Sequence, residues 1–231
     1  MESNIRTIIN QTTGATSPEQ NRVLRNTYAL LALSMVPTVI GALFGTTIAA
    51  PLLMGSPMMS MVIFLGGAFG LMFAVQKTKD SSMGVFFLLA FTLFMGAMLG
   101  PLLSVALHFR NGGTLIAMAA GGTGAVFLVL AGVASNTKRD FSNLGKFLFI
   151  GLIMMIIASI ANMFLHLPVL QLVLSAAGVL IFSGFLLFDI NRIVKGGETN
   201  YITATLAVYL DIYNLFVNLL MLLMAFAGDR R

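Results

Sequence analysis

The feature that most constrains this chain is the length of its uncharged, apolar runs. No charged residue occurs between Arg25 and Lys77. A helix that crosses a bilayer core of about 30 Å takes about 20 residues, so this run suits two such helices joined by a short turn. The segment APLLMGSP, residues 50–57, supplies the helix-breaking residues for that turn. The run therefore predicts helices that cross a membrane.

The composition of the whole chain supports the same class. It has 231 residues, of which 58% are hydrophobic and only 9% are charged, and its mean hydropathy is +0.96. A soluble domain of this length could not cover its surface with so few polar side chains. The chain has no cysteine, which excludes disulfides and thiol chemistry. We therefore expect an all-α polytopic membrane protein.

Polar breaks divide the apolar sequence into seven transmembrane helices. The expected spans are residues 27–49, 57–75, 83–107, 114–133, 147–165, 169 to about 189, and 202–227. This gives three parts: a polar N-terminal tail at 1–26, a seven-helix domain at 27–227 and a short C-terminal tail at 228–231. The N-terminal tail lacks the apolar core of a cleaved signal peptide.

The basic residues predict the orientation in the membrane. With alternating loops, ten of the 13 Lys and Arg lie on the side of the N-terminus: Arg6, Arg22, Arg25, Lys77, Lys79, Lys138, Arg139, Lys146, Arg192 and Lys195. The other side has Arg110, Arg230 and Arg231. Because cytoplasmic loops are enriched in Lys and Arg, we expect a cytoplasmic N-terminus and an external C-terminus. Basic residues scattered over short loops do not indicate a nucleic-acid-binding face.

Two aspartates, Asp189 and Asp211, lie inside apolar runs, whereas the other six acidic residues lie in polar termini or loops. An ionisable side chain within a membrane costs several kcal/mol and indicates function. At 1.5 Å per residue, Asp189 lies about 9 Å and Asp211 about 13 Å from the loop that joins the two helices. The helices form an antiparallel hairpin, so we expect the two carboxyl groups to meet at similar depth.

The seventh span predicts burial of its aspartate within protein. Small and polar residues share one helical stripe, made of Ala204, Ala207, Asp211, Asn214 and Asn218. Such a stripe is typical of a helix packed inside a bundle. Candidate partners of the aspartate pair are Asn214, Asn218 and Arg192, which follows Asp189 by three residues.

The chemistry of this pair leaves several functions open. Two neighbouring carboxylates in a low dielectric cannot both ionise cheaply, so the pair is expected to share a proton near physiological pH. It then acts as a proton-sensitive latch between helices, or loses its protons and holds a hard cation such as calcium through oxygen ligands. The alternative is an Asp–Arg or Asp–Asn hydrogen bond that only fixes helix register. The isolated His108 and His166 are assigned no role.

Three pairs of glycines four residues apart are candidate helix-packing sites. They are Gly41 with Gly45, Gly66 with Gly70, and Gly96 with Gly100. Such spacing lets helix backbones approach closely in a membrane. The alternative is that glycine is simply frequent in membrane helices.

Several segments resemble the Bax inhibitor-1 (TMBIM) family. They are FMGAMLGPLL at 94–103, LLFDINRIVKGGETNYI at 186–202, YLDIYNLFVNLLMLL at 209–223 and, as in the bacterial YccA-type branch, LRNTY at 24–28. The resemblance implies seven helices with the last at the centre of the other six. It also implies that Asp189 and Asp211 form the family's di-aspartyl unit, which is linked to a pH-dependent calcium leak.

The resemblance further implies a partner and a difference. Members of the YccA-type branch are associated with the membrane AAA protease FtsH as modulators of its proteolysis, which implies the bacterial inner membrane. Some family members carry an arginine in the second span as a partner of the aspartates. The second span here, residues 57–75, has no basic residue, and Arg192 is the nearest substitute.

Two functions therefore stay open, and a third is set aside. The first is a calcium leak or pH-sensitive regulator, and the second is modulation of FtsH by protein contact through the tail at 1–26. Intramembrane aspartyl proteases also place two aspartates on successive spans, but within Tyr-Asp and Gly-x-Gly-Asp motifs. Phe188 precedes Asp189 and Leu210 precedes Asp211, and no Ser/His or Cys/His set is present. We expect a protein that is not an enzyme and has no cofactor beyond a calcium ion.

Overall fold

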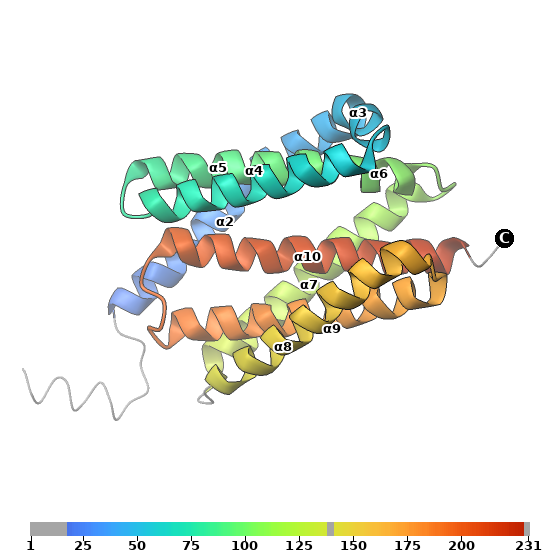
Figure 1. Ribbon diagram of the computed structural model, residues 1–231. Helices are drawn as coiled ribbons and strands as arrows, with labels where there is room; N and C mark the ends of the chain where they lie inside the picture. The colour runs from blue at the N-terminus through green and yellow to red at the C-terminus, as the bar shows by residue number, and fades with distance from the viewer. Residues whose placement is uncertain (1–17, 138–140, 229–231) are drawn as a thin grey trace, which may run out of the picture.

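The computed structural model describes residues 18–137 and 141–228, and within these ranges it contains helices and no strand. The helices are α2 (Pro18–Phe44), the π-helix η1 (Gly45–Ala49), α3 (Ala50–Met54), α4 (Pro57–Thr78), α5 (Ser82–Met98), α6 (Gly100–Leu107), α7 (Gly112–Asn136), α8 (Ser142–Leu165), α9 (Pro168–Val194) and α10 (Tyr201–Gly228). Figure 1 shows them as a bundle of long, roughly aligned or crossing helices.

The predicted number of spans is confirmed. Seven helical segments within the described ranges are long and apolar enough to cross a membrane. Two of them are interrupted: η1 and α3 follow α2, and the third span changes from α5 to α6 next to Pro101. Proline lacks the N–H that continues a helix, so it is suited to the start of α6.

The first transmembrane span starts earlier than the sequence indicated. Helix α2 begins at Pro18, with Glu19 in its first turn, whereas the expected span began at Thr27. Proline at a first helical position and an acid near the positive end of the helix dipole both favour this start. Residues 18–26 of the expected polar tail are therefore helical, while residues 1–17 lie outside the described part, as do residues 229–231.

Helix α10 occupies the centre of the bundle. In Figure 1 it runs between α4 and α5 on one side and α8 and α9 on the other, with α2 and α7 crossing behind it. It contacts α2, α4, α5, α7 and α9, while α8 packs against α9. No residue from Tyr201 to Met224 is exposed. The expected central position of the last helix is confirmed, with α8 on the outside of α9.

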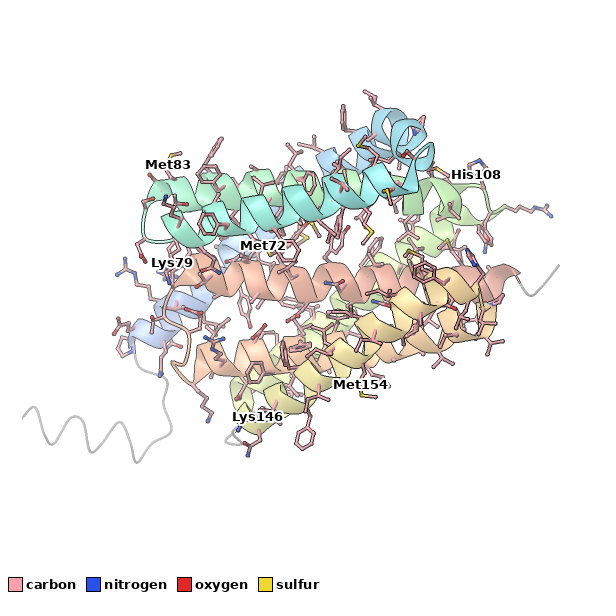
Figure 2. The ribbon with its side chains drawn as sticks, viewed as in Figure 1. Met72, Lys79, Met83, His108, Lys146 and Met154 are labelled. Atoms are coloured by element: carbon pink, nitrogen blue, oxygen red, sulfur yellow. The ribbon has the colours of Figure 1, made fainter. Side chains whose placement is uncertain are left out.

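Several basic residues gather at one end of the bundle. Figure 2 shows Lys79 and Lys146 at the end where α4 joins α5 and α9 joins α10, and His108 at the opposite end. This end also carries Arg192 and Lys195, at the close of α9. These basic residues come from different loops that the sequence placed on one side of the membrane, and in the structure they lie at the same end of the bundle.

The start of α10 is fixed by one asparagine. The Asn200 Oδ1 accepts hydrogen bonds from the backbone N–H groups of Ile202 (2.9 Å) and Thr203 (3.3 Å), which is an N-cap. Its Nδ2 donates to the Lys79 carbonyl (3.0 Å) and the Asp80 carboxylate (2.9 Å). One side chain therefore caps the central helix and ties it to the turn between α4 and α5.

Two of the three predicted glycine pairs mediate the contact between the first and third spans. A Cβ on Gly41 would lie 2.1 Å from the Leu93 carbonyl oxygen, and a Cβ on Gly96 would lie 2.1 Å from the Thr38 carbonyl oxygen. A Cβ on Gly45 or Gly100 would meet backbone in the same seam. Backbone carbonyls cannot swing aside, so only glycine permits this approach.

The prediction for Gly66 and Gly70 is wrong. A Cβ at either position would meet nothing within 4 Å, because this face of α4 points away from the bundle. The neighbouring Gly67 is the one that packs, since its Cβ would lie 2.3 Å from the ring of Phe94. Gly66 and Gly70 have the spacing of a packing pair, but they lie on the face of α4 that does not contact another helix.

We expect Gly96→Ala to lower the free energy of unfolding by about 1–3 kcal/mol, because the added methyl group forces α2 and α5 apart. Gly70→Ala is the matched control and should leave stability unchanged or slightly higher, since alanine is the better helix former. Thermal unfolding of both purified variants in detergent measures the difference. Equal melting temperatures for the two variants would contradict the seam.

Candidate functional site

The two aspartates that the sequence singled out come together. Asp189 lies near the end of α9, and Asp211 lies in the first half of α10. Their side chains are within hydrogen-bonding distance of one another. Asp211 is buried, with 6% of its surface exposed, and Asp189 is half-buried. The antiparallel hairpin thus brings the two carboxyl groups to one place.

One oxygen of this pair has no hydrogen-bond donor. The Asp211 Oδ2 is buried without a partner among the described residues. A buried carboxylate oxygen without a donor is costly unless the group is protonated or meets a cation. The arrangement therefore offers a buried acceptor that is suited to a proton or a cation.

The nearest predicted cation, Arg192, is engaged in the loop. Its guanidinium lies 3.6 Å from the Glu198 carboxylate, and its Nε donates to the Gly197 carbonyl at 3.2 Å. The ion pair that the structure gives Arg192 is thus with Glu198, in place of the expected pairing with Asp189.

The two asparagines of the predicted stripe bond to their own helix. The Asn214 Nδ2 donates to the Leu210 carbonyl (2.8 Å), and the Asn218 Nδ2 donates to the Asn214 carbonyl (2.7 Å). Asn218 also packs against α9, where a Cβ on Gly178 would lie 2.3 Å from its Oδ1. Their role as partners of the aspartates stays a prediction.

Sequence reasoning missed the side chain that anchors α10 next to the pair. The hydroxyl of the buried Tyr209 shares a hydrogen bond with the Thr38 hydroxyl (3.0 Å) and donates to the Thr92 carbonyl (3.4 Å). Its ring meets that of Phe91 edge-on, with centroids 6.0 Å apart. Tyr209 therefore ties α10 to both α2 and α5, two residues before Asp211. A tyrosine within an apolar span was the available signal.

The pair alone does not form a complete binding site for a resident metal ion. No group of three or more His, Cys, Asp or Glu that could hold a metal occurs among the residues described. Calcium takes six to eight oxygen ligands, and two carboxylates supply only part of that set. The histidine rings have local contacts, His108 with the Ser104 carbonyl and His166 with the Phe164 carbonyl. The site suits a proton or a cation in passage.

Fold and site together define a class: a seven-helix membrane protein with a buried pair of carboxyl groups between its last two helices. The family model described as Inhibitor of apoptosis-promoting Bax1 matches residues 20–228. The chain belongs to the Bax inhibitor-1 family.

Relatives support this membership. An uncharacterised membrane protein of Vibrio cholerae is 43% identical over 205 residues, which cover 89% of this chain and 90% of the relative. The protein named "Modulator of FtsH protease YccA" of Escherichia coli K12 is 42% identical over 203 residues, covering 88% of this chain and 90% of the relative. A protein named "Inner membrane protein YccA", from Escherichia coli O6:H1, shows the same identity and coverage.

Tyr209→Phe should lower the free energy of unfolding by about 1 kcal/mol, because it removes the hydroxyl that links α10 to α2. Combined with Thr38→Val, the two losses should be less than additive, since both remove the same hydrogen bond. Thr47→Val is the matched control: its hydroxyl donates to the Leu43 carbonyl one turn back in the same span, so its effect should add to that of Tyr209→Phe. Chemical unfolding in detergent gives all three values. Strict additivity for Tyr209 and Thr38 would contradict the bond.

Proposed function

We propose that this chain is an integral membrane regulator in which Asp189 and Asp211 form a proton-sensitive cation site, giving a pH-dependent leak of calcium. The observation that carries the proposal is the hydrogen-bonding contact of two carboxyl groups between α9 and the central helix α10, with one buried oxygen left without a donor. Membership of the Bax inhibitor-1 family supports it.

The pair supplies a two-state latch. With one proton shared, the carboxyl groups bond to each other and hold α9 against α10. Without that proton, two negative charges repel in a low dielectric, and the same oxygens become ligands for a hard cation. Gain or loss of one proton therefore changes both the helix contact and the affinity for a cation.

The opening of this latch does not involve an arginine of the second span. Helix α4 has no basic residue before Lys77, which lies in its last turn. The Arg192–Glu198 ion pair joins the last turn of α9 to the loop that leads into α10. We assign that loop the role of adjusting the latch, in place of a partner on α4.

The proposed location is the bacterial inner membrane, with the N-terminus in the cytoplasm and the C-terminus outside. The gathering of Lys and Arg at the end of the bundle that holds the α4–α5 and α9–α10 loops supports this orientation. The name of the Escherichia coli O6:H1 relative supports the membrane. The aspartate pair then lies in the cytoplasmic half.

Flux into liposomes tests the site. Purified protein should admit calcium at a rate that varies between about pH 6 and 8, and Asp211→Asn should change that dependence, since Asp189 then has no second carboxyl group with which to share a proton. Glu19→Gln, at the exposed start of α2, is the matched control and should behave as wild type. If wild-type protein admits no more calcium than empty liposomes, the proposed leak is contradicted. If Asp211→Asn keeps the wild-type pH dependence, the proposed role of the aspartate pair is contradicted.

A second function is favoured by the name of one relative. The Escherichia coli K12 protein is named a modulator of FtsH protease. We propose that this chain likewise modulates a membrane AAA protease of the FtsH type by protein contact, as a regulator and not as an enzyme. The N-terminal segment before α2 is the proposed contact, because its sequence is polar and has no apolar periodicity. The two functions are compatible.

Deletion of residues 2–17 keeps α2 whole and tests this contact. The full chain should change the rate at which FtsH degrades a membrane substrate in proteoliposomes, and the deletion should remove the effect. Asp211→Asn should retain it if contact alone is responsible. An effect that survives the deletion and disappears in Asp211→Asn would refute the tail and assign the modulation to the aspartate pair.

A further inference from the structure

A groove separates two helices that contact each other only lightly, α4 and α10. Its volume is about 560 Å³, within the range of ligand-binding pockets. One wall comes from α4, with Phe69, Phe73 and Gln76, and the other from α10, with Thr203, Ala207 and Leu210. The lining residues of each wall recur at helical spacing, so two continuous helix faces bound the groove.

The groove runs inward from the basic end of the bundle. Helix α4 ends and α10 begins at that end, so Gln76 lies level with Thr203, and Phe69 lies level with Leu210. Seven residues at 1.5 Å each give a depth of about 10 Å, which is less than one leaflet of the bilayer core. The polar residues are at the mouth, and the remainder of the wall is apolar.

The groove opens toward the surrounding lipid. Phe69 is 64% exposed and Phe73 is 70% exposed, so the α4 wall is not closed by other parts of the described chain. A transmembrane helix with its side chains is about 10–12 Å wide and much longer than this groove. A single lipid acyl chain is narrow enough to enter the groove, and the bilayer around this face supplies such chains.

The charges at the mouth select the headgroup. Lys77 is exposed in the last turn of α4, and Lys79 follows directly after the helix. Figure 2 shows Lys79 where the end of α4 lies beside the start of α10. The nearby carboxylate of Asp80 accepts a hydrogen bond from Asn200. Lysines just cytoplasmic of a transmembrane helix attract anionic lipids.

We propose that the α4–α10 groove is a binding site for an anionic phospholipid, with one acyl chain between the helices and the phosphate at Lys77 and Lys79. The bound chain fills the space that light α4–α10 packing leaves. Its end reaches Leu210, the residue before Asp211, so the lipid adjoins the helix that carries the aspartate pair. The site itself does not depend on any cation leak.

The absence of tryptophan from the chain permits a clean test. Phe73→Trp places a fluorophore in the groove. Phe86→Trp, on α5 and 62% exposed, places one on ordinary lipid-facing surface at a similar distance from the same end of the bundle. Both variants are reconstituted into vesicles of phosphatidylcholine that contain one-tenth brominated-chain phosphatidylglycerol. Equal melting temperatures verify that both are folded.

The groove tryptophan should be quenched at least threefold more than the control tryptophan, because a specific site concentrates the minority lipid. Lys77→Gln with Lys79→Gln should remove the excess, and so should Ala207→Phe, which fills the groove. Lys77 is exposed and Lys79 is half-buried at the end of the bundle, so their variant stays informative if Ala207→Phe fails to fold.

Three outcomes would overturn the proposal. Equal quenching at both tryptophans would mean ordinary boundary lipid. No quenching of the groove tryptophan would mean that protein occupies the groove, with the N-terminal segment as the first candidate. Equal excess quenching by brominated phosphatidylcholine used as the minority lipid would mean a lipid site without selection for negative charge.

Discussion

The arrangement of this bundle depends on keeping a carboxyl group away from lipid. Asp211 lies in the middle of an apolar sequence, and lipid offers a carboxylate neither hydrogen bonds nor a high dielectric. The helix that carries it is therefore enclosed by α2, α4, α5, α7 and α9. Tyr209 and Asn200 fix that helix from two sides, one through α2 and α5 and the other through the α4–α5 turn. The burial of Asp211 therefore requires α10 to lie at the centre of the bundle.

Close backbone contact provides the rigid part against which this helix is held. In a membrane, apolar side chains gain little by meeting each other, so helix association relies on packing and hydrogen bonds. The seam of Gly41, Gly45, Gly96 and Gly100 joins the first and third spans at backbone distance. Thr38 belongs to that seam through its carbonyl and to α10 through its hydroxyl. The seam and the central helix are therefore linked by one residue.

Length and charge predicted the seven spans because both are properties of the chain alone. The meeting of Asp189 and Asp211 was also predictable, since a short loop between two helices fixes their relative depth. Which way a helix faces was not: Gly66 and Gly70 have the same spacing as Gly41 and Gly45 but point away from the bundle. Pairings across long separations were equally hidden. Arg192 was three residues from Asp189 yet pairs with Glu198, and Tyr209 reaches Thr38 on the first helix.

The packing around α10 is unequal. Its contacts with α9 and α7 are extensive, whereas those with α4 are few and leave the groove lined by Phe69 and Leu210. In the proposed function a change in charge at Asp189 and Asp211 would act on the α9–α10 contact, and the proposed lipid would act on the α4–α10 contact. Both contacts involve the same helix within one turn, since Leu210 and Asp211 are adjacent. The proposed proton and the proposed lipid would therefore both act on α10, and a difference in helix position that favours one of them would change the affinity for the other.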